Sequence, residues 1–205
     1  MFDVTELVGH WGYLAVFVIV VLGNVGLPVP EETALFSAGY LVWRGDLRWS
    51  LVLTVGIVSA VAGDNVGYWI GRRYGPDVLE RFRRLIGLSP QRFQSMRTFI
   101  WRWGPLGVFV ARFIAGLRFL AGPLAGAVGL HFTAFMTANV LGALVYVPAV
   151  VVAGYAVGYG AGAYVERVLQ ALGPVQYIVL AGAIILVGSV FIWRAVRTFS
   201  DWAGP

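Results

Sequence analysis

The chain has 205 residues, of which 59% are hydrophobic and 12% charged, with a formal net charge of +5. Its mean hydropathy of +0.79 excludes an ordinary soluble domain and is typical of a membrane protein. The absence of cysteine excludes disulfides, thiolate metal sites and a cysteine nucleophile, and two histidines, His10 and His131, are too few for a histidine-rich metal cage. We expect one integral membrane domain, all-α, with no metal and no cofactor.

Arginine supplies all of the positive side-chain charge, because the chain contains no lysine. Eight arginines lie between Arg72 and Arg102, wedged between apolar stretches. A nucleic-acid-binding protein would need a soluble basic face, so no nucleic-acid partner is expected. The N-terminus carries Asp3 and Glu6 ahead of the first apolar run and no basic residue, which is unlike a cleaved signal peptide, and we expect it to be retained.

The first two predicted elements are a span and a hairpin. Residues 11–27 are long enough to cross a ~30 Å hydrocarbon core and predict a transmembrane helix. Residues 28–44 are short for a span and predict a re-entrant hairpin. Glu31 and Glu32 follow Pro30, which favours a helix start, because acids complement the positive end of the helix dipole. The same carboxylates are also candidates for a proton or ligand site inside the membrane. The helix start and the functional site both stay open as interpretations.

The next two elements are an apolar span and a basic segment. Residues 51–71 predict a second transmembrane helix, and Asp64 inside it is a candidate functional carboxylate, with structural pairing to an arginine as the competing interpretation. Residues 72–104 combine many arginines with an apolar stripe, which is typical of amphipathic helices on a membrane surface. The positive-inside rule predicts that this segment is cytoplasmic, and binding of anionic lipid head groups by its arginines is compatible with that placement.

The most unusual stretch is residues 105–130, which is apolar but carries Arg112 and Arg118 and is interrupted by Gly116 and other glycines. A charge at the bilayer centre costs at least about 2.5–3.5 kcal/mol. Broken backbone at membrane depth is tolerated only where protein or a water-filled cavity surrounds it. These features predict a second re-entrant hairpin that faces an internal site.

Two further transmembrane helices are predicted, at residues 132–160 and 174–194. The first contains Asn139, and His131 just before it is interpreted as an interfacial residue. Arginines after the second indicate a cytoplasmic C-terminus. If the basic segment is cytoplasmic as well, the first hairpin dips in from outside and the second from the cytoplasm.

An internal repeat supports two opposed hairpins. The motif GYWIG at 67–71 recurs as GYAVG at 154–158, an offset of 87 residues that also carries Gly39 onto Gly126 and places Glu31 on Arg118. An inverted-topology repeat of this kind puts substrate at the midplane, between discontinuous helices. The repeated motif residues are Gly67, Tyr68, Gly71, Gly154 and Tyr155.

The order of motifs resembles a known family. PxPEE is followed by GDNVGYWIGRRYG, then by ARFIAGLRFLAGPLAG, and then by a span with an internal asparagine and a GYxxG ending. This order resembles the DedA family, whose VTT or SNARE-associated domain is shared with eukaryotic lipid scramblases, over roughly residues 20–160. The resemblance implies a multi-pass protein of the bacterial inner membrane that moves undecaprenyl phosphate or a phospholipid between leaflets and depends on the proton motive force.

The resemblance also implies site residues. The acid of the family's Pro-x-acid motif, its membrane aspartate and its two arginines fall on Glu32, Asp64, Arg112 and Arg118. The chain departs from the family at Gly23, where many members have an acid, so proton coupling through a pair of acids stays open. It departs again at Ala115, where many members have a proline, although Gly116 can still supply the helix break.

The spacing of the two arginines bears on mechanism. On an unbroken helix Arg112 and Arg118 would lie about 240° apart around the axis and ~9 Å apart along it. A break at Gly116 lets them converge, and two guanidiniums can grip one phosphate in bidentate fashion. We therefore predict a lipid-phosphate translocase in which Glu32 and Asp64, with Glu31, act as counter-charges or proton-coupling groups. The competing interpretation is that the carboxylates merely neutralise the arginines.

Other functions are weighed against this prediction. A proton-coupled ion or small-anion transporter could use the same opposed hairpins and is the alternative. A membrane phosphatase would need a nucleophile or metal beside the arginines, and neither Ser59 nor His131 has convincing partners, so we expect no enzyme and no catalytic residues. The expected partners are anionic or phosphate-bearing membrane lipids, and assembly with further copies of the chain stays open.

Overall fold

The computed structural model describes residues 4–172, apart from positions 28, 86 and 115, and these residues form six α-helices and no strand. Over this part of the chain the predicted all-helical class is confirmed. The predicted span at 174–194 lies outside the described residues. Two of the described helices are long and apolar enough to cross a membrane, over Trp49–Gly75 and Phe132–Gly162.

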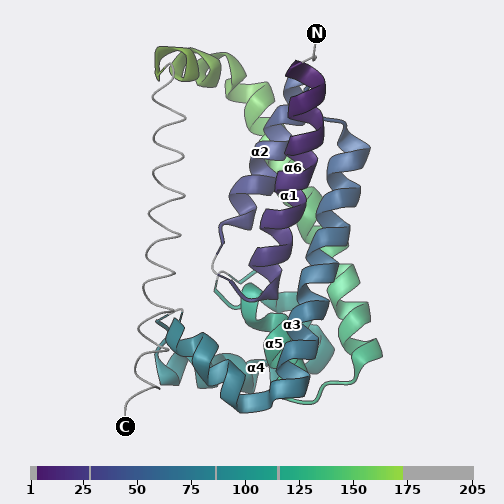
Figure 1. Ribbon diagram of the computed structural model, residues 1–205, viewed down its shortest axis with the longest axis vertical. Coiled ribbons are helices and arrows are strands. Elements are labelled where there is room, and N and C mark those ends of the chain that lie inside the picture. Colours follow the sequence, from purple (N-terminus) through teal and green to yellow (C-terminus); the bar gives the residue numbers. More distant parts are fainter. Residues whose placement is uncertain (1–3, 28, 86, 115, 173–205) are drawn as a thin grey trace.

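The first hairpin consists of α1 (Val4–Val25) and α2 (Glu31–Arg44), which run beside each other with the turn near mid-height (Figure 1). The apolar part of α1, Trp11–Val25, is shorter than a full span. Residues 28–44 were expected to form a hairpin by themselves, but they contain the single helix α2. The reversal of chain direction comes before that helix, where Gly26 has a φ of 122° and Pro28 and Pro30 follow. The sequence of α2 itself contains no proline that would break the helix.

The basic segment occupies the end of α3 and most of α4. α3 (Trp49–Leu85) changes direction at Gly75, whose φ is 59°, and α4 (Pro90–Ala111) does so at Gly104, whose φ is 53°. The Ser89 side chain accepts a hydrogen bond from the backbone of Arg92 and so caps the start of α4. Between the two glycines the chain lies across the lower end of the bundle (Figure 1).

The second hairpin consists of the last turns of α4 and the whole of α5 (Arg118–Ala127). The long helix α6 (Phe132–Leu172) follows α5. The chain reverses over residues 112–117, and Gly116 has a φ of 85° there. Such a backbone conformation is open to glycine and strained for other residues. The predicted break at this position is therefore present in the structure.

Several helix bounds in the two halves of the chain coincide at the offset of 87 residues. Shifted by 87, α1 falls on 91–112, beside α4, while α2 starts where α5 starts and α3 ends where α6 ends. The packing is crossed, because α2 packs on α6 and α5 packs on α3. A Cβ at Gly39 would lie 2.1 Å from the Val151 carbonyl oxygen, and one at Gly126 would lie 2.0 Å from the Tyr68 carbonyl oxygen. The glycine pair at this offset thus makes similarly close contacts with the backbone of the facing helix.

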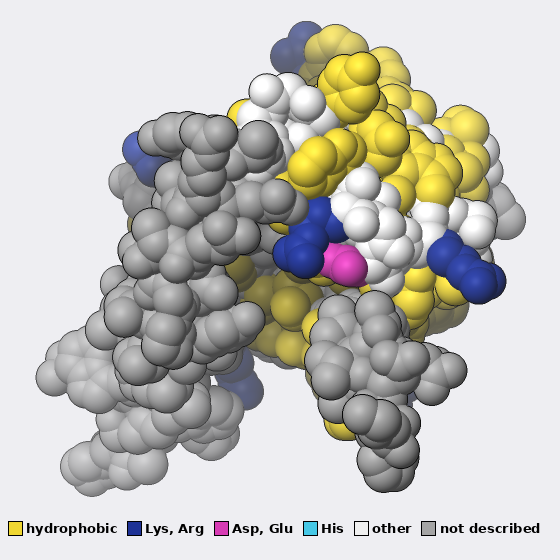
Figure 2. Space-filling view, turned by 90° about the horizontal axis from the view of Figure 1, so that it is seen from above, with side chains coloured by type: hydrophobic (Ala, Val, Ile, Leu, Met, Phe, Trp, Pro, Cys, Tyr) yellow, Lys and Arg dark blue, Asp and Glu magenta, His cyan; other side chains and the backbone are white. Residues whose placement is uncertain are grey.

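Apolar side chains cover much of the outer surface. Seen from above, hydrophobic groups occupy most of the described surface, and charged groups are few (Figure 2). On α6, Leu141, Leu144 and Val145 are each about half exposed. Soluble monomers rarely expose so much contiguous apolar surface, and a surrounding bilayer removes this cost. The exposed surface agrees with a membrane location.

Candidate functional site

The candidate site lies where two hydrophobic clusters meet. Along α3, Ala60 belongs to one cluster and Tyr68 to the other, with Asp64 between them. Along α6, Ala143 belongs to the same cluster as Ala60 and Ala138 to the same cluster as Tyr68, with Asn139 between them. Buried polar and charged groups are therefore concentrated at the boundary between the packing units of the two hairpins. The buried members are Asn24, Glu31, Asp64, Arg112 and Asn139.

Arg112 is enclosed in a buried network. Its guanidinium forms an ion pair with Asp64 and donates a hydrogen bond to Asn139 Oδ1 at 2.5 Å. Arg112 is 5% exposed and Asp64 is 3% exposed. A Cβ at Gly142 would lie 3.3 Å from Arg112 Cδ, so this glycine provides the space for the arginine stem. The network joins the end of α4 to α3 and α6.

Arg118 lies among three partners from two other helices. It pairs with Glu31, at 3.6 Å, and with Glu32, both at the start of α2. It also donates a hydrogen bond to the Tyr146 hydroxyl at 2.5 Å and lies 5.7 Å from the centre of that ring. The residue that the 87-residue offset places on Glu31 is thus the residue that contacts it.

The two carboxylates beside Arg118 differ in their surroundings. Glu31 accepts a hydrogen bond from the Asn24 amide, which also donates to the Val20 carbonyl at 2.8 Å. The side chain of Glu31 is 5% exposed, whereas that of Glu32 is 45% exposed. Of the groups that hold Arg118, Glu32 is therefore the one that a ligand can displace most easily.

One buried acceptor in the site is unused. Asp64 pairs with Arg112 through Oδ2, while Asp64 Oδ1 is buried and has no hydrogen-bond partner among the described residues. A buried acceptor without a partner is unfavourable by about 1–3 kcal/mol. A proton or a donor that reached this oxygen would remove that cost.

The repeated glycine and tyrosine motifs lie outside the charged cluster. Tyr68 is buried, and its hydroxyl donates to the Leu130 carbonyl at 2.6 Å. The rings of Tyr155 and Trp49 meet in a T-shaped arrangement. Gly71 and Gly154 pack on the backbone of Pro123 and of Phe36, respectively, and Gly67 packs on the ring of Pro123. These residues position the helices, and the structure records no contact between them and Arg112 or Arg118.

Sequence reasoning did not assign a role to Tyr146 or Asn24. A signal for Tyr146 exists, because it follows Asn139 by seven residues in one helix and so lies on the same face. Asn24 appears in the sequence only as a polar residue at the end of an apolar run. Its role depends on Glu31, seven residues further on and beyond a turn, which no helical periodicity indicates.

These features define a class of protein: a helical membrane protein in which two hairpins bury oppositely charged side chains between long helices. The sequence profile of the VTT domain matches residues 29–156, which includes both arginines and all three carboxylates. The chain belongs to this VTT-domain family, the DedA family.

Several bacterial membrane proteins are similar to the chain. The uncharacterized membrane protein slr0232 of Synechocystis is 34% identical over 196 residues, which cover 96% of this chain and 89% of the relative. YbfM of Bacillus subtilis is 27% identical over 155 residues, covering 76% and 96%. Rv2637 of Mycobacterium tuberculosis is 35% identical over 159 residues, covering 76% and 73%. No solved structure matches the chain.

Proposed function

We propose that the protein is a translocase, and not an enzyme, that moves a phosphate-bearing lipid across the bacterial inner membrane. Undecaprenyl phosphate and phospholipids are the substrates that this proposal covers. The observation that carries it is the position of Arg118, between the buried Glu31 and the half-exposed Glu32, with the Tyr146 hydroxyl as its third partner. A lipid whose phosphate competes with Glu32 for the guanidinium can keep its hydrocarbon chains in the bilayer.

The two arginines take different roles in this proposal. Arg118 exchanges a carboxylate for the phosphate, because guanidinium binds both groups with the same planar fork of donors. Arg112 is more firmly enclosed, by Asp64 and Asn139, and a joint grip by both arginines requires the Arg112 network to open as well. Opening of that network is then the step at which the two hairpins move apart.

The proposed route uses opposed hairpins. We propose that α1–α2 and α4–α5 are the two halves of an inverted repeat and enter the membrane from opposite sides, with residues 72–104 and the C-terminus in the cytoplasm. The matched helix bounds and the crossed packing support this arrangement. So does the position of α2 in the upper part of the molecule and α5 in the lower part (Figure 1). Inverted repeats place the transported group near the midplane.

Proton coupling has a defined candidate in this scheme. Protonation of Asp64 at its unpartnered Oδ1 would remove the negative charge opposite Arg112 and free this cation for phosphate. Such a step would link the proton motive force to opening of the buried network. We propose Asp64 as the coupling residue and Glu31 and Glu32 as counter-charges.

The test is lipid movement in liposomes. The purified protein is reconstituted with a fluorescent lipid that carries a phosphate, and the fraction in the outer leaflet is followed by quenching. Arg118→Lys keeps the charge but loses the fork of donors, so the initial rate is expected to fall at least about tenfold, which corresponds to about 1.4 kcal/mol of lost hydrogen bonding. Arg44→Lys is the matched control, because Arg44 pairs with Asp46 on the surface. A wild-type rate in Arg118→Lys contradicts the phosphate grip.

A proton-coupled ion or small-anion transporter is the second candidate, because a small anion could compete with Glu32 in the same way. The same vesicles separate the two functions when radioactive phosphate or chloride uptake is measured beside lipid movement. Anion uptake without lipid movement would replace the lipid proposal by this alternative.

A further inference from the structure

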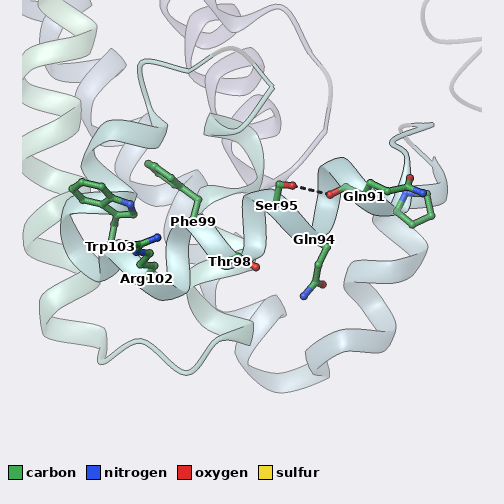
Figure 3. Close-up of a pocket in the computed structure, with 8 residues that line it drawn as sticks. Gln91, Gln94, Ser95, Thr98, Phe99, Arg102 and Trp103 are labelled. Atoms are coloured by element: carbon green, nitrogen blue, oxygen red, sulfur yellow. Dashed lines mark hydrogen bonds between the residues drawn. The ribbon is translucent and has the colours of Figure 1, made fainter.

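One side of α4 carries a row of hydrogen-bonding side chains outside the charged cluster. Gln91, Ser95, Thr98 and Arg102 follow one another at intervals of four, three and four residues, which places them on one side of the helix, and all four are exposed. With Gln94 they line an open groove of about 680 Å³ (Figure 3). The Ser95 hydroxyl donates to the Gln91 backbone carbonyl at 3.0 Å. The side chains of Gln91, Thr98 and Arg102 remain available for hydrogen bonds with a ligand.

The arginines of the basic segment differ in the partners that the structure gives them. Arg83 and Arg84 form ion pairs with Glu80, and Arg72 donates to the Leu130 carbonyl at 3.2 Å. Arg102 forms no ion pair with any residue that the structure describes. The sequence contains no Asp or Glu from residue 81 to residue 165. The groove at Arg102 is therefore a positively charged surface without a compensating acid on its own helix.

One flank of the groove is aromatic. Phe99 and Trp103 stack with ring centres 6.1 Å apart, and both line the groove. Trp101 and Trp103 are 72% and 52% exposed, which is typical of side chains at a membrane–water interface. The groove combines a cation, uncharged donors and an aromatic surface on a helix that lies across the end of the bundle (Figure 1).

We propose that this groove binds the head group of an anionic phospholipid. The phosphate contacts Arg102 together with Gln94 and Thr98, and the glycerol and first acyl carbons lie against Phe99 and Trp103. A free phosphate ion would use the polar wall only. Because this groove and the Arg118 site share no residue, the inference does not rest on the proposed translocation.

The test is lipid binding to the full chain in a non-ionic detergent. Phosphatidylglycerol or phosphatidylcholine is titrated, and the tightest-bound lipid is quantified by native mass spectrometry. We expect phosphatidylglycerol to bind at least about tenfold more tightly than phosphatidylcholine. Arg102→Gln is expected to reduce the affinity for phosphatidylglycerol at least about tenfold, since charge-assisted hydrogen bonds to phosphate are stronger than neutral ones. Thr98→Val, which changes no charge, is expected to reduce it severalfold.

One control variant makes the outcome decisive. Arg48→Gln removes one arginine at the α2–α3 turn, outside the groove, and is expected to leave the tightest binding unchanged. Equal losses in Arg48→Gln and Arg102→Gln would show unspecific attraction and overturn the proposal. Unchanged binding in both Arg102→Gln and Thr98→Val would also overturn it. So would competition by inorganic phosphate at concentrations similar to those of the lipid.

Discussion

The Arg118 guanidinium is held by the Tyr146 hydroxyl and lies 5.7 Å from the centre of the Tyr146 ring. Tyr146 extends from α6, whereas the two glutamates that also hold Arg118 extend from α2. A carboxylate competes with an incoming phosphate, but an uncharged hydroxyl does not. Tyr146 is therefore suited to keep the guanidinium in place while Glu32 leaves.

Tyr146→Phe should affect transport more than folding. It removes the hydroxyl and keeps the ring, so the unfolding temperature in detergent should change little. The lipid concentration at half-maximal rate should rise severalfold in the liposome assay, because the guanidinium loses one of its fixed contacts. Tyr146→Leu also removes the cation–π contact, worth about 0.5–2 kcal/mol, and should have a larger effect. Tyr155→Phe on the same helix is the control, and an equal effect there would contradict a positioning role for Tyr146.

Asp64→Asn should destabilise the protein. It leaves the buried Arg112 without its counter-charge, and breaking a buried pair in this way costs about 3–5 kcal/mol. The double variant Asp64→Leu/Arg112→Leu removes both charges and should be less destabilised than either single leucine variant. Thermal unfolding in detergent measures all four variants, and strictly additive losses in the leucine series would argue against direct coupling.

Gly39→Ala and Gly126→Ala should be destabilising to a similar degree, because each added Cβ would lie about 2 Å from a carbonyl oxygen of the facing helix. Overpacking of this kind typically costs about 1–3 kcal/mol. Gly160→Ala is the matched control, since nothing lies within 4 Å of a Cβ there. The unfolding temperature should fall in the first two variants and stay the same or rise in the third. A tolerated Gly126→Ala would contradict the close crossed packing.

Glu80 should make stability depend on pH in the acid range. Its hydrogen bond with Arg83 is the main cause that lowers the pKa of Glu80 to about 2, from a usual value of 4.5. Because the folded-state pKa is depressed, this stabilisation is complete above about pH 4.5 and is lost as the pH falls towards 2. The pair is partly exposed, so its contribution should be at most about 1 kcal/mol. The difference in unfolding temperature between wild type and Glu80→Gln should shrink between pH 6 and pH 3, and a constant difference would contradict it.

Local sequence signals predicted much of the architecture. The break at Gly116 and the basic surface helices follow from residue types within one segment. The 87-residue offset, read from a five-residue glycine motif, aligns Glu31 with Arg118, and the structure shows that these two side chains are in contact. The prediction for the first hairpin is wrong, because residues 28–44 contain only its second arm, α2. The turn that completes the hairpin lies before this segment, at Gly26.

The division of roles between Glu31 and Glu32 was harder to predict. Consecutive residues in a helix point about 100° apart, so one can be buried while the other stays at the edge. The buried positions of α2 are Glu31, Leu35, Ala38 and Gly39, a helical spacing that places Glu31 on the inner face. Resemblance to the family directed attention to Glu32 instead. The contact with Tyr146 joins α6 to α5, and only tertiary packing determines it.

The cluster takes all of its carboxylates from the first half of the chain and both of its arginines from the second. In the proposed arrangement, the first half enters the membrane during synthesis before its counter-charges exist. Each uncompensated charge at the bilayer centre costs at least about 2.5–3.5 kcal/mol. A chain truncated before Arg112 would keep Glu31, Glu32 and Asp64 without partners and would be exposed to quality-control proteolysis. Stable insertion of the early helices thus depends on completion of the late ones, which links membrane integration to full-length synthesis.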